Sequence, residues 1–175
     1  MIRVEKEKFA LYGFELMIPS GWRVELNPKT GRERGDVAFQ STKGNRIFVS
    51  WGPLAEAQKR FKTLEEHRDT NVQRIRKGPD VTEVRVSDLR ELQIGGHRAL
   101  GSHVTATVKA GMMSRRTAER EVWSVHVHCP KTGRYYVLYS MTRDPAEFED
   151  FPQIFKSVSE SFVCHPVQED EPETG

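Results

Sequence analysis

Hydrophobic and polar residues alternate along much of this chain with the period of two that is typical of strands with one buried face. The first such stretch puts Phe14, Leu16 and Ile18 on one face, and the turn Pro19–Gly21 ends it. Trp22 follows the turn, and we expect its ring to cap the hydrophobic core. The same alternation predicts strands over residues 14–18, 22–26, 36–41, 46–51, 81–94, 97–110, 121–129 and 135–141.

Two stretches have the spacing of a helix instead. Between about residues 60 and 77, hydrophobic residues recur near helical spacing until Gly78-Pro79 ends the element. The clearer helix covers residues 151–163, with a stripe of Phe151, Ile154, Phe155, Val158 and Phe162. Strands and helices are segregated, without regular βαβ alternation. The pattern therefore predicts an α+β fold with a mainly antiparallel sheet of about six strands and helices on both faces.

Length and charge describe one domain with an acidic end. A chain of 175 residues suits a single domain, which we place at residues 1–166. Residues 167–175 hold four acids and no base, so the remainder has 27 Lys and Arg against 21 acids, a net charge of +6. We expect the acidic tail to be disordered, and a role for it in shielding the basic surface stays open.

The sequence predicts a cytoplasmic protein without a membrane span. No apolar run approaches the ~20 residues that a membrane-spanning helix needs, and residues 1–10 lack the apolar region of a secretory signal. Cys129 and Cys164 are the two cysteines of the chain, too few for a disulfide scaffold. A single bridge between them stays open, because sequence alone does not give the distance between their Cα atoms.

Three segments together resemble the PsbP-like superfamily. They are the opening motif from Gly13-Phe14 to Trp22, the segment from Leu92 to Ala99, and the closing segment from Phe155 to Phe162. The superfamily takes in the PsbP protein of photosystem II, a Ran-binding nuclear import factor, and DcrB-like proteins including effector chaperones of type VI secretion. The resemblance covers about residues 9–163. It implies an α/β/α sandwich and binding roles, and it supplies no catalytic residue.

Histidines are the first candidates for chemistry. His126 and His128 share one face of the strand 121–129, and a hairpin centred near Ser114 would place His103 directly opposite His126. Three imidazoles on one sheet face could bind zinc or copper, as a metal-binding protein or metalloenzyme would require. The alternative is a polar outer face that carries histidines without a ligand. Register decides between them, because a slip of one residue moves a side chain to the other face.

We expect no enzymatic activity, no catalytic residue and no cofactor. The chain contains no serine-centred nucleophile motif, no phosphate-binding glycine loop and no HExxH zinc motif. Cys129 ends a strand and shares a face with Val125 and Val127. This position favours a role for Cys129 as a small buried hydrophobic residue over a role as a nucleophile. Cys164 is followed directly by His165, but neighbours at a helix end rarely point at one another.

The loop between the strands 97–110 and 121–129 is the candidate contact surface. It carries Met112 and Met113 beside Arg115 and Arg116, whereas hairpin tips are usually small and polar. Flexible thioethers next to guanidinium groups suit an adaptable contact with a protein partner. The same arginines could contact the phosphates of a nucleic acid, and methionines that fold back on the core are a further alternative. The sequence thus predicts a non-catalytic binding or adaptor module, and it leaves the partner's identity and the oligomeric state open.

Overall fold

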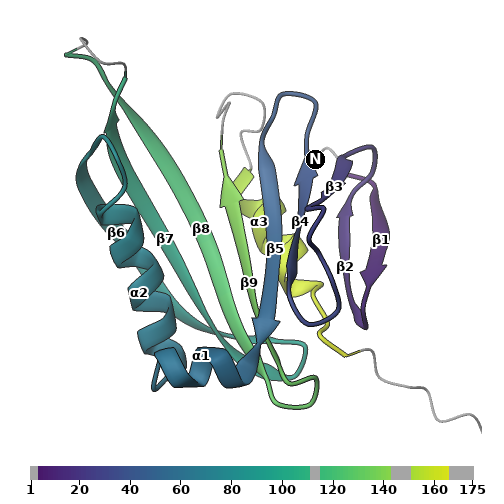
Figure 1. The fold of residues 1–175 in the computed structure, drawn as a ribbon. Coiled ribbons are helices and arrows are strands. Elements are labelled where there is room, and N and C mark those ends of the chain that lie inside the picture. Colours follow the sequence, from purple (N-terminus) through teal and green to yellow (C-terminus); the bar gives the residue numbers. More distant parts are fainter. Residues whose placement is uncertain (1–3, 111–114, 143–150, 166–175) are drawn as a thin grey trace, which may run out of the picture.

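The computed structural model describes residues 4–110, 115–142 and 151–165 of the chain. Within these ranges it has nine strands and three helices (Figure 1). In chain order they are β1 (Lys6–Leu11), β2 (Phe14–Pro19), β3 (Arg23–Leu26), β4 (Gly35–Gln40), β5 (Arg46–Pro53), α1 (Leu54–Arg60), α2 (Leu64–Arg76), β6 (Val81–Ile94), β7 (His97–Lys109), β8 (Thr117–Cys129), β9 (Arg134–Met141) and α3 (Phe151–Glu160). The predicted acidic tail, residues 167–175, lies outside the described residues.

Seven of these strands form one antiparallel sheet in the order β3-β4-β5-β9-β8-β7-β6, and β1 and β2 form a separate hairpin. The α+β fold with an antiparallel sheet is as predicted, with seven strands in the sheet instead of about six. The alternation from Phe14 to Ile18 does form β2, and its partner strand β1 was not predicted. Gly21 follows β2 with φ of +82°, the positive φ that a tight turn asks of glycine.

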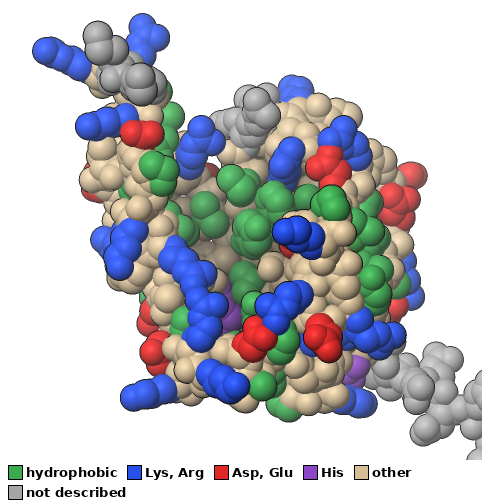
Figure 2. Space-filling model, in the orientation of Figure 1, with side chains coloured by type: hydrophobic (Ala, Val, Ile, Leu, Met, Phe, Trp, Pro, Cys, Tyr) green, Lys and Arg blue, Asp and Glu red, His purple; other side chains and the backbone are tan. Residues whose placement is uncertain are grey.

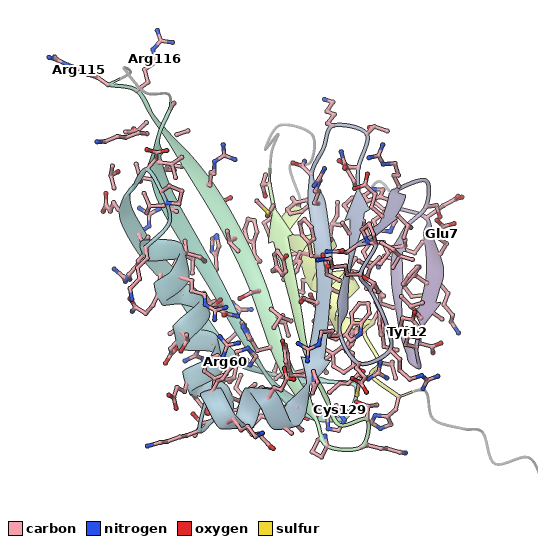
Figure 3. The ribbon with its side chains drawn as sticks, viewed as in Figure 1. Glu7, Tyr12, Arg60, Arg115, Arg116 and Cys129 are labelled. Atoms are coloured by element: carbon pink, nitrogen blue, oxygen red, sulfur yellow. The ribbon has the colours of Figure 1, made fainter. Side chains whose placement is uncertain are left out.

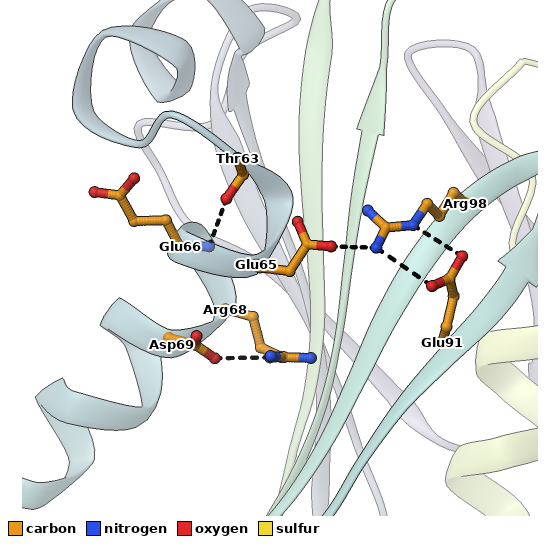
Figure 4. Close-up of polar contacts among 7 residues, drawn as sticks. All are labelled: Thr63, Glu65, Glu66, Arg68, Asp69, Glu91 and Arg98. Carbon is orange, nitrogen blue, oxygen red and sulfur yellow. Dashed lines mark hydrogen bonds and ion pairs between the residues drawn. The ribbon is translucent and has the colours of Figure 1, made fainter.

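The helix expected over residues 60–77 is α2, which begins four residues later, and the short helix α1 before it was not predicted. Phe61 has the extended backbone angles φ −131° and ψ 126°, which end α1 before α2 begins. The side chain of Thr63 accepts a hydrogen bond of 3.1 Å from the backbone N–H of Glu66, and this cap starts α2 (Figure 4). Arg98 of β7 then joins α2 to the sheet, since its guanidinium pairs with Glu65 and donates to Glu91 at 2.8 Å (Figure 4).

The back face of the sheet holds the main hydrophobic core, under α3 and the β1–β2 hairpin (Figure 1). Phe155 of α3 is 4% exposed, which confirms that the aromatic stripe of this helix is buried. The ring of Phe14 lies 5.1 Å from Trp51 and 5.8 Å from Phe162, and Trp22 is partly buried against the same cluster. The opening motif thus serves core packing, as its pattern indicated.

The front face of the sheet is only partly covered by helices in the described residues. α2 lies over β6, β7 and β8, and α1 contacts β5 and β9 near their lower ends (Figure 1). The front of β4 and the upper parts of β5 and β9 have no helix of the described chain on them. This difference between covered and uncovered strands creates a hollow beside α2. None of the described helices is long and apolar enough to cross a membrane.

Candidate functional site

A pocket of about 450 Å³ lies between α2 and the front face of the sheet. We call it the front groove. Figure 2 shows a hollow on this side of the molecule, with hydrophobic side chains along it and Lys and Arg side chains at its border. Its apolar lining comes from Ala57, Phe61, Val72, Ile75, Val122, Val137 and Met141, and its polar lining from Ser50, Glu56, Arg60, His67, Asn71, Arg74, Ser102, Ser124, His126, Tyr135 and Tyr139.

Strand and helix periodicity direct these side chains into the groove. Alternate residues of β8 and β9 point forward, so Val122, Ser124 and His126 face the same way as Val137 and Tyr139. The strands β7 and β8 pair Ser102 with Ser124, whose hydroxyl oxygens lie 2.6 Å apart. On the opposite wall, His67 and Asn71 stand one helical turn apart on α2 and share one side of the helix.

His67 is the centre of a ring cluster at the closed end of the groove. Its imidazole stacks on Phe61 with ring centroids 4.4 Å apart and an interplanar angle of 9°. It meets His126 and Tyr135 edge to face, at 4.9 Å and 5.2 Å between centroids. His128 lies 5.3 Å from it, and the His67 Nδ1 and His128 Nε2 atoms are 3.0 Å apart, within hydrogen-bond distance. The cluster ties α2 to β8 and β9.

His126 is the most buried polar group of the front groove. It is 1% exposed, and the amide of Asn71 donates a hydrogen bond of 2.6 Å to its Nε2. Arg74 in turn donates to the side-chain oxygen Oδ1 of Asn71 at 3.4 Å. This contact orients the side-chain amide of Asn71. A neutral ring that accepts at Nε2 carries its proton on Nδ1, and this buried Nδ1 has no hydrogen-bond partner in the described residues. This donor is shielded from solvent, so a bound molecule would reach it only if the ring moved.

The pKa values of His67, His126 and His128 are all lowered, so these side chains are neutral near pH 7. The pKa of His67 is lowered to about 4, mainly by burial and secondly by the neighbouring His128. The pKa of His126 is lowered to about 3, mainly by burial and secondly by His67. Burial also lowers the pKa of His128. His128 and Arg68 also act on His126, and Arg74 and Arg60 act on His67, and all of them disfavour protonation too. The groove therefore presents neutral imidazoles beside apolar surface, an arrangement suited to holding an apolar molecule with one or two hydrogen bonds.

The alternative in which His103, His126 and His128 cluster on one sheet face is wrong. Strand β7 pairs His103 with Trp123, three residues from the predicted partner His126. An odd shift in register moves a side chain to the other face. His103 therefore lies behind the sheet, stacked on Trp123 at 4.4 Å between ring centroids, while His126 and His128 face α2.

The predicted contact surface at the β7–β8 hairpin tip is described in part. Arg115 and Arg116 are exposed and lie at the far end of the long hairpin, away from the body of the protein (Figure 3). Met112 and Met113 lie outside the described residues. The structure does not bring Arg115 and Arg116 near the front groove, so the tip and the groove are two separate surfaces (Figures 2 and 3).

Both cysteines are buried at one end of the sheet. Their Sγ atoms lie 3.1 Å apart, and Cys129 is a buried residue of the core, as its strand position indicated. The expectation that Cys164 and His165 point apart is wrong, since Cys164 Sγ lies 3.1 Å from His165 Nδ1. Burial, then the hydrogen bond to Cys129, raises the pKa of the Cys164 thiol to about 12. A thiol in this state is a poor nucleophile.

Sequence reasoning missed the residues that α2 contributes to the groove. His67 and Asn71 belong to a stretch that is dominated by charges, where a solvated helix face is the ordinary interpretation. Their spacing of four residues on a helix was the available signal, but it becomes informative only once α2 is known to lie on β8.

No protein-family model and no curated protein matches this chain. Solved structures do match. CyanoP, the cyanobacterial PsbP of Synechocystis sp. PCC 6803, aligns with a TM-score of 0.62 at 12% identity over 91% of this chain and 92% of CyanoP. The Ran-binding protein Mog1p of Saccharomyces cerevisiae aligns with a TM-score of 0.59 at 10% identity over 93% and 97%. LpqN of Mycobacterium tuberculosis, involved in cell envelope biogenesis, aligns with a TM-score of 0.51 at 15% identity over 94% and 93%.

These alignments cover nearly the whole of each chain, and identities of 10 to 15% show the fold alone. They agree with the resemblance drawn from the opening motif, the Leu92–Ala99 segment and the closing segment. By its structure, this protein has a PsbP/Mog1p-like fold.

Proposed function

We propose that this protein is a non-catalytic binding module that holds an apolar segment of a partner protein in the front groove. The observation that carries the proposal is the apolar front of the sheet beside α2, which no helix within residues 4–110, 115–142 and 151–165 covers. Tyr139 of β9 stacks on Phe48 of β5 there, with centroids 4.7 Å apart and an interplanar angle of 8°. Met141 is 48% exposed at the upper end of the groove. Covering apolar surface of this kind contributes roughly 25 cal/mol for each Å² removed from water.

The length of the groove favours a protein segment over a small molecule. Its lining follows β9 from Tyr135 to Met141, which is about 20 Å of strand at ~3.3 Å per residue. A helix of about 13 residues has the same length.

Polar groups around the groove would orient the segment. Arg60 and Arg74 line the same groove, and they favour acidic residues next to the apolar segment. The net positive charge of residues 1–166 has the same sign as these two arginines, so it also favours an acidic partner.

Relatives in fold support binding as a role without identifying a partner. Mog1p is a Ran-binding protein, which shows that this fold can carry a protein contact. The absence of a catalytic role and the cytoplasmic location stay predictions of the sequence. LpqN shows that the fold also serves a protein involved in cell envelope biogenesis.

A photocrosslinking experiment in the native host tests the proposal. A photoreactive phenylalanine analogue replaces Tyr139 in the groove, Arg115 at the hairpin tip, or Glu7 on β1. Glu7 is exposed on the side of the molecule away from α2 and serves as the matched control (Figure 3). We expect discrete protein adducts at position 139 and none at position 7, with the crosslinked peptide of the partner containing an apolar run.

Three outcomes would overturn the proposal. Protein adducts at position 115 alone would move the contact to the hairpin tip. A small molecule found on the purified protein by native mass spectrometry, without protein adducts at position 139, would replace the segment with a small ligand. Nucleic-acid adducts whose binding weakens by about 0.9 log units per log unit of salt for each phosphate contact would support the nucleic-acid alternative.

A further inference from the structure

Four side chains that can bind a metal ion meet at the lower end of the sheet, where Cys129 is labelled in Figure 3. His97 begins β7, Cys129 ends β8, and Cys164 and His165 follow α3. Their candidate ligand atoms all lie within 4.8 Å of one another. Three segments far apart in the chain thus converge on one point.

Backbone geometry holds these three segments together. Extending the β7–β8 register by two residues sets His97 opposite Cys129. The turn before His97 consists of Gly95 and Gly96, both with positive φ, as a two-residue hairpin requires. A Cβ atom at Gly95 would lie 3.3 Å from the Phe162 carbonyl oxygen, so this turn packs directly on the segment after α3.

The segment after α3 is fixed from its other side as well. Glu15 of β2 and Val163 exchange two backbone hydrogen bonds of 2.9 Å each. Val163 directly precedes Cys164, so the position of the thiol follows from a clamped backbone. The four side chains therefore belong to a preformed arrangement supported by β2, β6, β7 and β8.

The distances within the cluster are close to those of a tetrahedral zinc site. The two Sγ atoms are 3.1 Å apart, and His165 Nδ1 lies 3.5 Å from Cys129 Sγ and 3.1 Å from Cys164 Sγ. Zn–S bonds of ~2.3 Å and Zn–N bonds of ~2.05 Å give tetrahedral edges of about 3.8 Å for S···S and 3.6 Å for S···N. Each of these three pairs has to separate by no more than about 0.7 Å to take these values.

Burial and charge favour a cation at this point. Cys129 is 0% and Cys164 1% exposed, and the buried Nε2 of His97 has no hydrogen-bond partner in the described residues. Two thiolates and Zn²⁺ sum to no net charge, so the occupied site is neutral and its burial carries no uncompensated ion. Thiolate and imidazole are also the ligands that Zn²⁺ prefers in proteins.

We propose that His97, Cys129, Cys164 and His165 bind one Zn²⁺ ion in a structural Cys2His2 site. On binding, both thiols release their protons to solvent and both imidazoles coordinate in the neutral form. Protein side chains supply all four ligands, which leaves no position for water or substrate. The ion ties the segment after α3 to the β6–β7 turn and to the end of β8. This site is separate from the front groove and does not depend on the proposed binding function.

A disulfide between Cys129 and Cys164 is the competing use of the same thiols. It needs the Sγ atoms to approach from 3.1 Å to about 2.05 Å. A disulfide would leave Nε2 of His97 buried without a partner and would give His165 no role. The two imidazoles beside the thiols thus favour the zinc site.

Metal analysis of the full chain tests the site. The protein is produced without a histidine tag, purified under reducing conditions and analysed for zinc, and a second sample is titrated with Co²⁺ after removal of zinc. We expect a zinc-to-protein ratio of about one and the visible bands of tetrahedral Co²⁺ with a sulfur-to-cobalt charge-transfer band. His165→Gln changes a side chain that is partly exposed, and it should weaken Zn²⁺ binding at least ten-fold.

The matched control is His103→Gln, which removes one histidine from the middle of the same strand, where it is paired with Trp123. It should leave zinc content and the Co²⁺ spectrum unchanged. A ratio well below one that His165→Gln does not alter would overturn the proposal, as would octahedral Co²⁺ spectra. Protein isolated without reductant that contains a Cys129–Cys164 disulfide and binds no zinc after reduction would also overturn it. The spectra of the unmodified chain decide the question even where a cysteine variant fails to fold.

Discussion

The front groove and the Cys/His cluster both use histidines on the β7–β8 pair, and they give the imidazole opposite surroundings. In the groove, His67 and His126 lie among rings, serines and arginines, so burial and nearby cations keep them neutral. In the cluster, His97 and His165 lie beside two thiols that become anionic ligands when a metal binds. The ligand that an imidazole can take is therefore decided by its neighbours, and histidine content alone does not indicate it.

Neighbouring residues of one strand serve the two regions. His128 faces α2 and contacts His67, whereas Cys129 faces back toward Cys164. Strand alternation makes this separation unavoidable, since successive side chains point to opposite faces. A change at either residue should thus affect one region and spare the other, and the following predictions test that independence.

The largest effect on stability is expected from Phe155→Ala in α3. Phe155 is 4% exposed in the core, and removal of a buried phenylalanine side chain costs about 3–5 kcal/mol. Denaturant unfolding measures the loss. Because α3 leads into Cys164 and His165, the variant should also weaken zinc binding while the groove histidines keep their contacts with α2. Unfolding at an unchanged denaturant concentration would contradict the burial of the α3 stripe.

Removal of zinc should come next in size. An ion that binds only the folded chain at about 1,000 times its dissociation constant stabilises that chain by ~4 kcal/mol. For a domain of this length, that amounts to roughly 8–16 °C in Tm. Differential scanning calorimetry with and without a zinc chelator measures it. Tyr139→Glu in the groove is the comparison variant, and its response to the chelator should equal that of the unmodified chain.

Acid should destabilise the protein through the groove histidines. Between pH 6.5 and about 4, the unfolded chain protonates His67 while the folded chain does not, and for His126 this interval extends to about pH 3. The free energy of unfolding therefore falls as pH falls, by at most about 1.4 kcal/mol per pH unit for each histidine. Urea unfolding between pH 7 and pH 4.5 measures the slope.

His67→Phe keeps a ring stacked on Phe61 and removes one titrating group, so it should flatten this slope. Val137→Ala is the matched control in the same groove. It should lower stability at every pH without changing the slope. An equal slope in His67→Phe and in the unmodified chain would contradict the lowered pKa of His67.

The smallest effect on stability is expected from Met141→Glu at the upper end of the groove. Met141 is 48% exposed, and surface substitutions usually change stability by no more than about 0.5 kcal/mol. The new carboxylate should nevertheless reduce crosslinking at position 139 at least ten-fold, because it places a charge on the apolar contact surface. Zinc content should stay the same. Full crosslinking with Met141→Glu would exclude this part of the groove from the contact.

Local patterns predicted the elements well where one physical rule dominated. The alternation around Phe14 and the stripe that includes Phe155 each describe one buried face, and the structure buries both. The start of α2 was also present locally, since Thr63 and Glu66 have the spacing of a helix N-terminal cap. β1 escaped prediction because its residues are mostly exposed and charged, so no apolar face stands out.

What the sequence determined by itself was the α+β class, the buried faces of the strands and the burial of Cys129, because these depend on residue type and short-range spacing. What only the tertiary structure decided was which distant residues meet. The β7–β8 register separated His103 from His126 and set His97 opposite Cys129, and the packing of α2 brought His67 to His126 and His128. The backbone bonds between Glu15 and Val163 placed Cys164 and His165 beside them. Register and helix docking are set by the summed packing of the whole core, so no local spacing in the chain reports them.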